Sequence, residues 1–158
     1  MLTTLRFRFP GSLQATDTIE PSRSSVSGSV GRLGDRKMKR CMFVDDSSVI
    51  RKVAKRILGG PMIVIEAASG YDALEMCMHD MPDIIVVDAA LPDLSGEEFI
   101  RRVRAIQGPV KPQIAICLTE VDIGAIMRAK RAGAQGYLLK PFNRPQLLQR
   151  FRSLELVA

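Results

Sequence analysis

The chain has 158 residues, of which 46% are hydrophobic and 25% are charged, a composition typical of one globular domain with a core large enough to fold alone. No apolar run approaches the roughly 18 residues that span a bilayer, so we expect no membrane insertion. The formal charge of +6 is weak evidence for nucleic-acid binding, because no aromatic residues interleave with the cations of the expected domain.

Residues 1–37 come first in the chain and differ from the rest. Between Pro10 and Gly34 they are rich in Ser, Thr and Gly without a helical or strand period, so they cannot bury enough apolar surface to offset the entropy of ordering. We expect a disordered extension over 1–37 and one domain over 38–158. The opening MLTTLRFRFPG resembles an organelle transit peptide, but Met38 leads directly into the first expected strand and is the favoured start codon. N-terminal sequencing of the native protein distinguishes the two.

From Arg40 onward, strand and helix signals alternate five times. The strands are short runs rich in Val, Ile, Leu, Cys and Met, and we expect them at 41–44, 62–66, 84–87, 114–118 and 137–139. The helices have apolar residues at helical spacing, and we expect them at about 49–58, 71–79, 97–106, 123–132 and 145–154.

The first and fourth helices carry clear local signals. Ser47 or Ser48 can cap the N-terminus of the first helix, and Gly133 can end the fourth. The polar face of the first helix carries four cations, opposite its apolar face: Arg51, Lys52, Lys55 and Arg56. In the fourth helix, a basic run is either a solvated face or part of a surface for an acidic partner: Arg128, Lys130 and Arg131.

The order of the elements predicts the fold class. The first, third and fourth strands are apolar on both faces, as in a parallel sheet covered by helices. Right-handed crossovers then give an α/β fold, a doubly wound five-stranded parallel sheet in the order 2-1-3-4-5 with helices on both faces. Ligands of such sheets bind at the carboxyl ends of the strands, and here the switch point lies between strands 1 and 3.

The cysteines indicate a reducing compartment. Cys41, Cys77 and Cys117 are widely spaced among apolar neighbours and form no CxxC or Cys/His metal pattern. We therefore expect buried, reduced thiols in a cytoplasmic protein.

Polar side chains follow four of the five expected strands. Asp45 and Asp46 follow the first strand, and Asp88 follows the third. Thr119 follows the fourth and Lys140 the fifth. Three neighbouring carboxylates resist ionising together, so a divalent cation is expected, with Mg²⁺ preferred because it takes few protein ligands. Such a site suits an incoming phosphoryl group, with Asp88 as the nucleophile that forms an aspartyl phosphate.

This arrangement resembles the receiver domain of two-component response regulators, over about residues 39–156. Leu91-Pro92 and Ser95-Gly96 match the family's loop after its phosphorylated aspartate. Lys140-Pro141 matches a pair that the family usually joins by a cis peptide, and Tyr137 lies where these domains carry a switch aromatic. Each match alone is weak, but the combination is specific.

The resemblance implies a role for each site residue. Asp45, Asp46 and Asp88 would hold Mg²⁺ together with the backbone carbonyl of Ala90. Asp88 would accept a phosphoryl group from a histidine kinase or a histidine phosphotransfer protein. Thr119 and Lys140 would bind that group, and inward movement of Thr119 would let Tyr137 swing inward. The face of the fourth helix, fifth strand and fifth helix would then signal to a protein partner.

Three residues depart from the family pattern. Glu120 follows the switch threonine, where the family usually has a small residue, and it is the one feature that favours a degenerate receiver unable to take phosphate. Ala90 and Val121 occupy the positions where the family tunes dephosphorylation. Because neither can orient an attacking water, we expect slow self-dephosphorylation.

The expected function is a stand-alone signalling switch, not a metabolic enzyme. Only 18 residues follow Lys140, which is enough for one helix. Chemotaxis regulators and cell-cycle phosphorelay intermediates are single receivers of this kind, and the sequence does not choose between their targets. The alternative class is a phosphatase of the haloacid-dehalogenase type with an aspartyl-phosphate intermediate. Such enzymes place a second acid two residues after the nucleophile, where this chain has Ala90.

Overall fold

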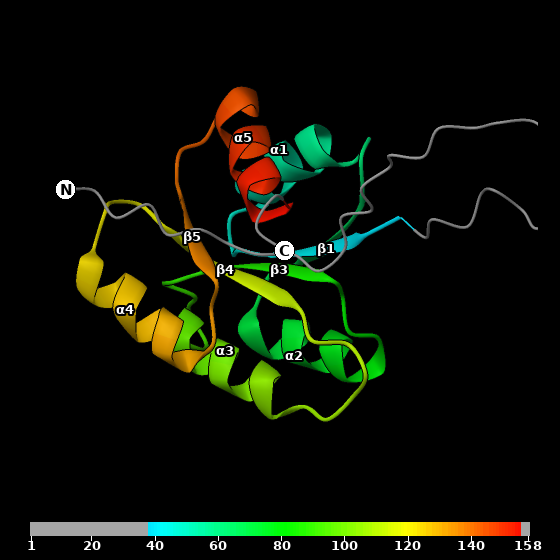
Figure 1. The fold of residues 1–158 in the computed structure, drawn as a ribbon, viewed down its shortest axis with the longest axis vertical. Coiled ribbons are helices and arrows are strands. Elements are labelled where there is room, and N and C mark those ends of the chain that lie inside the picture. The colour runs from blue at the N-terminus through cyan, green and yellow to red at the C-terminus, as the bar shows by residue number, and fades with distance from the viewer. Residues whose placement is uncertain (1–37, 156–158) are drawn as a thin grey trace, which may run out of the picture.

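A computed structural model of the chain describes residues 38–155, so the extension expected over 1–37 lies outside the described residues. Strands and helices alternate along the described chain as expected (Figure 1). The elements are β1 (Arg40–Val44), α1 (Ser48–Leu58), β2 (Ile63–Ala67), α2 (Gly70–His79), β3 (Ile84–Asp88), α3 (Gly96–Ala105), β4 (Gln113–Leu118), α4 (Ile123–Ala132), β5 (Gly136–Leu139) and α5 (Arg144–Glu155).

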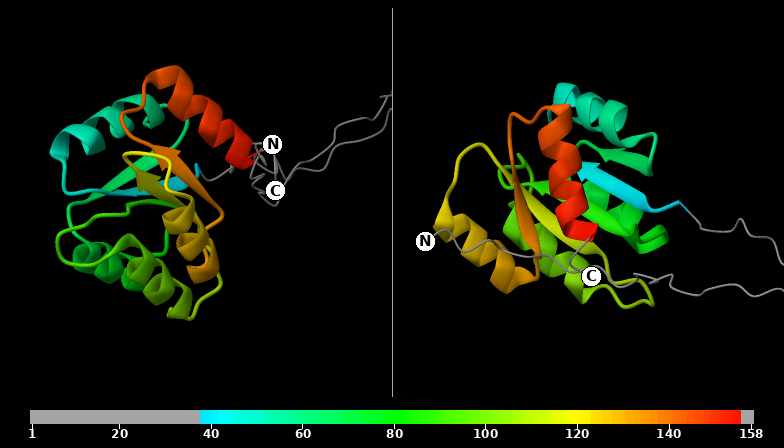
Figure 2. Two further views of the ribbon diagram at one scale, coloured as in Figure 1. Left: turned by 90° about the vertical axis from the view of Figure 1, so that its left-hand side faces the viewer. Right: turned by 45° about the horizontal axis from the view of Figure 1, so that its top comes forward.

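The five strands form one parallel sheet in the order β2-β1-β3-β4-β5, which confirms the predicted topology. Helices α1 and α5 cover one face of this sheet, and α2, α3 and α4 cover the other (Figures 1 and 2). All carboxyl ends of the strands therefore lie along the same edge. None of the helices in the described part of the chain is long and apolar enough to cross a bilayer.

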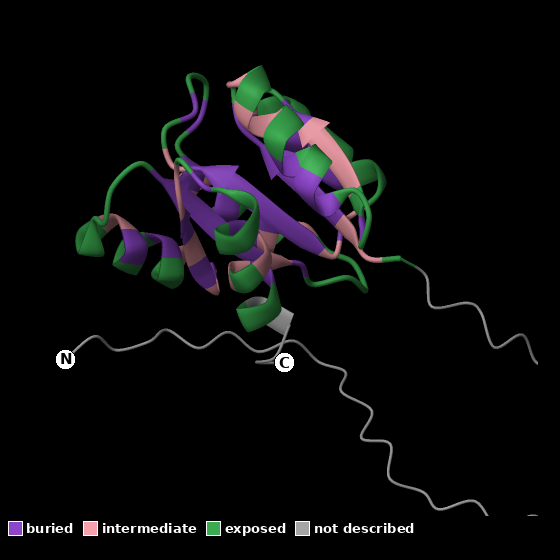
Figure 3. Cartoon of the chain, turned by 90° about the horizontal axis from the view of Figure 1, so that it is seen from above, coloured by how far each residue is buried: buried purple, intermediate pink, exposed green. Residues whose placement is uncertain are grey.

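The central strands are buried on both faces because successive side chains enter two different cores (Figure 3). In β1, Met42 and Val44 pack on the side of α2–α4, whereas Cys41 and Phe43 pack on the side of α1 and α5. None of these four side chains is accessible to solvent. This alternation holds β1 rigidly in the middle of the sheet, directly beside β3.

The cysteines are buried free thiols, in agreement with the sequence. Burial raises the pKa of the Cys77 thiol to about 11 and that of the Cys117 thiol to about 12. Burial also raises the pKa of Cys41. All three are therefore protonated packing residues near neutral pH.

The helix ends follow the local chemistry of the sequence. The side chain of Ser47 accepts a hydrogen bond from the N–H of Ile50, so Ser47 and not Ser48 caps α1. Gly133 ends α4 with a φ of 120°, a backbone conformation that favours glycine. The second strand was predicted to begin at Met62, but the N–H of Met62 donates to the carbonyl of Leu58 and Met62 belongs to the turn after α1.

Candidate functional site

Three aspartates from two neighbouring strands meet at the carboxyl edge of the sheet. Asp45 and Asp46 follow β1, and Asp88 is the last residue of β3. Each offers one carboxylate oxygen, and these oxygens lie within 4.8 Å of one another. Asp45 and Asp88 are buried, whereas Asp46 is exposed and its side chain has no partner within residues 38–155. The cluster is therefore open to solvent on the side of Asp46.

Asp45 is held by hydrogen bonds on three sides. Its N–H donates to the carbonyl of Ala67 in β2, at 3.1 Å. Its Oδ1 accepts from the N–H of Ser47 at 2.8 Å, and its Oδ2 accepts from the Lys140 ammonium at 2.9 Å. With only 1% of the residue exposed, the carboxylate has little freedom to turn.

Lys140 brings a positive charge into the cluster from β5. Its Nζ lies 2.9 Å from Asp45 Oδ2 and 3.1 Å from Asp88 Oδ2. Burial lowers the pKa of Lys140, but the hydrogen bonds and charges of the two aspartates outweigh burial and raise the pKa above its usual value. A cis peptide joins Lys140 to Pro141. The backbone N–H of Lys140 donates to the carbonyl of Leu118 in β4 at 2.7 Å. Lys140 is thus charged, and this hydrogen bond holds its backbone against β4.

The loop after Asp88 is built by close backbone contacts. Asp88 Oδ1 accepts from the N–H of Ala90 at 3.2 Å, and the N–H of Gly96 donates to the carbonyl of Ala89 at 3.1 Å. A Cβ on Gly96 would lie 2.7 Å from the backbone oxygen of Asp88. Ser95 caps α3 by accepting from Glu98. The Ser95-Gly96 pair therefore returns the chain across the end of β3, close to the site.

Thr119 lies farther along the same edge, whereas Tyr137 lies within β5. Thr119 follows β4, is exposed, and its hydroxyl makes no hydrogen bond with any residue in the described range 38–155. With Lys140 it borders a cavity of about 590 Å³ whose other wall is α5. Tyr137 is half-buried in β5, and the guanidinium of Arg150 lies 4.6 Å from its ring centroid.

Arg51 is a site residue that the sequence reasoning missed, since it was placed with the cations of the polar helix face. Its NH1 instead donates to the backbone carbonyl of Asp45 at 2.7 Å, and its side chain is only 16% exposed. The available signal was its position one turn after the capping Ser47, on the side of the helix that faces the acidic turn.

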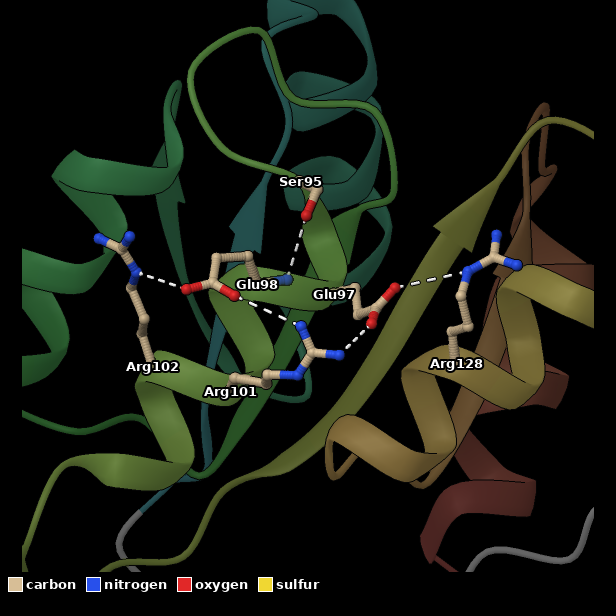
Figure 4. A network of polar contacts seen from close by, with 6 residues as sticks. All are labelled: Ser95, Glu97, Glu98, Arg101, Arg102 and Arg128. Atoms are coloured by element: carbon tan, nitrogen blue, oxygen red, sulfur yellow. Dashed lines mark hydrogen bonds and ion pairs between the residues drawn. The ribbon is translucent and has the colours of Figure 1, made fainter.

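The basic run of α4 divides between two roles (Figure 4). Arg128 forms an ion pair with Glu97 of α3 at 3.4 Å. Glu97 also forms an ion pair with Arg101. The neighbouring Glu98 forms ion pairs with both Arg101 and Arg102. Lys130 and Arg131 are exposed. Arg128 therefore tethers α4 to α3. The exposed Lys130 and Arg131 fit a solvated face and equally a surface for an acidic partner, which stays a prediction.

The residues present fit a hard divalent cation. Three carboxylate oxygens within 4.8 Å are suitable ligands for Mg²⁺, which prefers oxygen and retains several waters. The exposed side of the cluster at Asp46 leaves room for those waters. Ala90 lies two residues after Asp88 in the same loop, and coordination by its carbonyl stays a prediction.

Comparison with known proteins identifies the family of the chain. A family model described as the response regulator receiver domain matches residues 41–152. The response regulator MprA of Mycobacterium ulcerans is 35% identical over 116 residues, which are 73% of this chain and 49% of MprA. The chemotaxis protein CheY of Thermotoga maritima is 28% identical over 113 residues, which are 70% of this chain and 92% of CheY. The chain thus spans about half the length of MprA and most of CheY.

The solved structures agree as well. The chemotaxis protein CheY4 of Vibrio cholerae has a TM-score of 0.70 and 31% identity, over 74% of this chain and 98% of CheY4. The BeF3-activated receiver domain of DrrB has a TM-score of 0.65 and 27% identity, over 74% of this chain and 97% of that domain. Since the family model covers well over half of the chain and the fold agrees with it, this protein belongs to the response regulator receiver domain family of two-component signalling.

Proposed function

We propose that this chain is a phosphorylation-controlled switch in which Asp88 accepts a phosphoryl group in a Mg²⁺-dependent reaction. The donor is a histidine kinase or a histidine phosphotransfer protein. The observation that carries the proposal is the Lys140 ammonium, which lies 2.9 Å from Asp45 and 3.1 Å from Asp88 inside the cluster of three aspartates. A cation beside a nucleophilic carboxylate and a metal-ligating pair is the charge arrangement that phosphoryl transfer needs.

The proposed transfer exchanges one bond to phosphorus for another. An oxygen of the Asp88 carboxylate bonds to phosphorus while the bond from phosphorus to the donor's imidazole nitrogen breaks, and the imidazole keeps the electron pair. Lys140 neutralises part of the charge on the phosphoryl oxygens. Mg²⁺, held by Asp45, Asp46, Asp88 and the Ala90 carbonyl, supplies the remaining positive charge when it is bound.

Thr119 and Tyr137 are the proposed response elements. The Thr119 hydroxyl is exposed and, among residues 38–155, unbonded, which supports its recruitment by a phosphoryl oxygen. Its inward movement would open space for the ring of Tyr137, which now lies beside Arg150. The surface of α4, β5 and α5 would change as a result, and a protein partner would read that change. Ile123 and Met127 of α4 are exposed apolar side chains that such a partner could contact.

We further propose that the chain acts as a single receiver in the cytoplasm. Its alignment with 92% of CheY supports this reading, and its match to about half of MprA favours the other arrangement, a receiver joined to a further domain. Receiver domains of this family are not metabolic enzymes. A phosphatase with an aspartyl-phosphate intermediate would need a second acid where this chain has Ala90. The candidate downstream targets are a flagellar motor and a component of a cell-cycle phosphorelay.

The test is phosphorylation of the full chain by acetyl phosphate, followed by intact mass. Wild type with Mg²⁺ is expected to gain one phosphoryl group, and removal of the metal with a chelator is expected to prevent the gain. Asp88→Asn should not be modified, because an amide is not a nucleophile at this position. Asp72→Asn is the matched control, since Asp72 is an exposed aspartate of α2 outside the cluster.

A second ligand separates loss of phosphate binding from repulsion of the phosphoryl donor by Glu120. Beryllofluoride with Mg²⁺ should shift the amide resonances around Asp88 and Lys140 in wild type and not in Asp88→Asn. The proposal is wrong if wild type takes neither acetyl phosphate nor beryllofluoride and behaves like Asp88→Asn. That outcome would favour the degenerate receiver.

A further inference from the structure

The turn between β1 and α1, residues Asp45–Ser47, carries two of the three carboxylates, and Arg51 holds it at two carbonyls. The backbone N–H of Arg51 donates to the carbonyl of Ser47 at 3.2 Å, as the first turn of α1 requires. The guanidinium of the same residue reaches back and donates from NH1 to the carbonyl of Asp45 at 2.7 Å. Arg51 therefore donates hydrogen bonds to the first and the last residue of the acidic turn.

The guanidinium is itself held from the far side. Its Nε lies 3.4 Å from Oε1 of Glu66 in β2, and the other oxygen of Glu66 lies 3.4 Å from Lys55. The Arg51 side chain is 16% exposed and that of Glu66 is 29% exposed. Because its guanidinium contacts both the carbonyl of Asp45 and the carboxylate of Glu66, the Arg51 side chain has one favoured position, between the acidic turn and β2.

This contact uses the particular geometry of arginine. A planar guanidinium donates from separate nitrogens, so it binds a carbonyl and a carboxylate at the same time, whereas a lysine ammonium is a compact point charge. Arg51 contacts the backbone carbonyl of Asp45, whereas Lys140 contacts the carboxylates of Asp45 and Asp88.

We propose that Arg51 is a positioning residue for the Mg²⁺ site. It presents Asp45 and Asp46 in their metal-binding geometry before the metal arrives, so that binding does not have to order the turn. This inference rests on the proposed function, because it assumes that Mg²⁺ binds the aspartate cluster. Ordering a site in advance strengthens binding, and residues that orient metal ligands commonly change metal affinity when they are replaced.

The test is Mg²⁺ titration of the full chain, followed at the amides of Asp45, Asp46 and Asp88 by two-dimensional ¹H–¹⁵N NMR. Arg51→Met keeps the length of the side chain but removes its donors, and we expect the dissociation constant for Mg²⁺ to rise by about tenfold. Arg51→Lys retains the charge but donates from a single nitrogen, so its affinity should be intermediate. The chain has no tryptophan, so NMR replaces intrinsic tryptophan fluorescence.

Lys52→Met is the matched control for the loss of one charge. Lys52 is an exposed cation on the same helix, and among residues 38–155 it has no ion-pair partner. Its removal should change the dissociation constant by less than about twofold, because an exposed charge is screened by solvent and salt. A second measurement needs no metal: in metal-free Arg51→Met, the amides of Asp46 and Ser47 should exchange hydrogen faster than in Lys52→Met of equal thermal stability.

Each outcome decides a separate point. If folded Arg51→Met binds Mg²⁺ as tightly as wild type, or if Lys52→Met weakens binding equally, the positioning role of Arg51 is overturned. If Arg51→Met does not fold, the same measurements are made on Arg51→Lys. A wild-type affinity for Mg²⁺ together with wild-type hydrogen exchange at Asp46 and Ser47 in Arg51→Lys would then overturn the role. If wild type shows no Mg²⁺-dependent change at Asp45, Asp46 and Asp88, the proposed function fails instead.

Discussion

At the scale of single residues, the site depends on where its cations lie relative to its carboxylates. Asp45 and Asp88 are both buried, and like charges at this separation repel. The Lys140 ammonium contacts both, and its side chain is only 12% exposed, so salt screens the contact weakly. Because these contacts raise the pKa of Lys140, their contribution to stability is fully present below its unfolded pKa of about 10.4 and is lost only as the pH rises through the higher folded pKa.

Replacement of Lys140 by methionine is therefore expected to destabilise the metal-free protein by about 3 kcal/mol, because it leaves two buried carboxylates without their cation. Urea unfolding of the full chain measures this, and Mg²⁺ should restore part of the loss. Lys55→Met is the control: Lys55 is 58% exposed and 3.4 Å from Glu66, so the expected loss is below about 1 kcal/mol. Equal losses in the two variants would contradict a special role for Lys140.

Also at this scale, two small apolar residues predict a long-lived aspartyl phosphate. Ala90 and Val121 are exposed beside the site and offer no group to orient an attacking water. Ala90→Asn introduces such a group and should speed the release of inorganic phosphate from the phosphorylated chain. Val110→Asn, an exposed position near the opposite ends of the strands, should leave the rate unchanged. A wild-type lifetime of only seconds at neutral pH would contradict this prediction.

At the scale of elements, the loop after β3 is tied to its neighbours at both of its sides. Asp93 of this loop accepts from the N–H groups of Gly70 and Tyr71 at the start of α2, both at 3.0 Å. On the far side, the N–H of Gly96 at the start of α3 donates to the carbonyl of Ala89 at 3.1 Å. Arg102 of α3 lies 5.5 Å from the ring centroid of Tyr71, which joins α3 to α2. The loop that begins at Asp88 is thus fixed to α2 as well as to α3, which restricts its movement.

The Asp93 contact predicts a pH dependence of stability. Desolvation of Asp93 would raise its pKa, but the hydrogen bonds from the backbone N–H groups of Tyr71 and Gly70 in α2, together with those of its own loop, outweigh it and hold the pKa below its usual value. A depressed folded pKa contributes stability above the unfolded pKa of about 3.9, and the contribution is lost as the pH falls through the folded value. Asp93→Asn should be less stable than wild type near neutral pH, and the difference should shrink toward pH 3.

Urea unfolding at both pH values measures this difference. Glu75→Gln removes an exposed carboxylate from α2 without removing a capping bond, and it serves as the control. A gap between Asp93→Asn and wild type that stays constant with pH would show that the carboxylate does not cap α2 in solution.

The connection from β3 to α3 also predicts a strict requirement for glycine. A Cβ on Gly96 would lie 2.7 Å from the backbone oxygen of Asp88 and 3.0 Å from the Cα of Ala89. Because both atoms belong to the backbone, Gly96→Ala must displace the end of β3, at an expected cost of about 1–3 kcal/mol. Beryllofluoride binding should weaken in the same variant.

Gly108→Ala is the matched control, since a Cβ there meets nothing within 4 Å. It should leave urea unfolding and beryllofluoride binding close to wild type. A Gly96→Ala protein with wild-type stability would mean that the loop relaxes without moving Asp88.

At the scale of the whole molecule, the parallel sheet brings distant parts of the chain to one edge. Lys140 and Asp45 are separated by 95 positions in the sequence and by 2.9 Å in space. The strand order puts β1 and β3 side by side at the centre, with β4 and β5 beyond them. Each central strand is buried on both faces, so the ends of these strands are rigid points from which the polar side chains project.

Much of this architecture was predictable because its signals are local. Hydrophobic period, caps such as Ser47 and stops such as Gly133 depend on a few neighbouring residues, and they predicted every element. The strand order then followed from the alternation of strands and helices and the right-handed crossovers that join parallel strands. The polar residues at the strand ends could also be assigned to one edge, since all carboxyl ends of a parallel sheet meet there. Met62 was wrongly given to β2, because an apolar residue in a turn has the same local pattern as one in a strand.

The sequence by itself therefore determined the α/β class, the 2-1-3-4-5 sheet and the cluster of Asp45, Asp46 and Asp88 with Lys140. Only the tertiary structure decided which cation of the first helix serves the site. Arg51 and Lys52 are adjacent and both positively charged, but Arg51 reaches the carbonyl of Asp45 while Lys52 faces solvent. That choice depends on how α1 is rotated against β1 and β2, which is set by the packing of both cores and not by any local pattern.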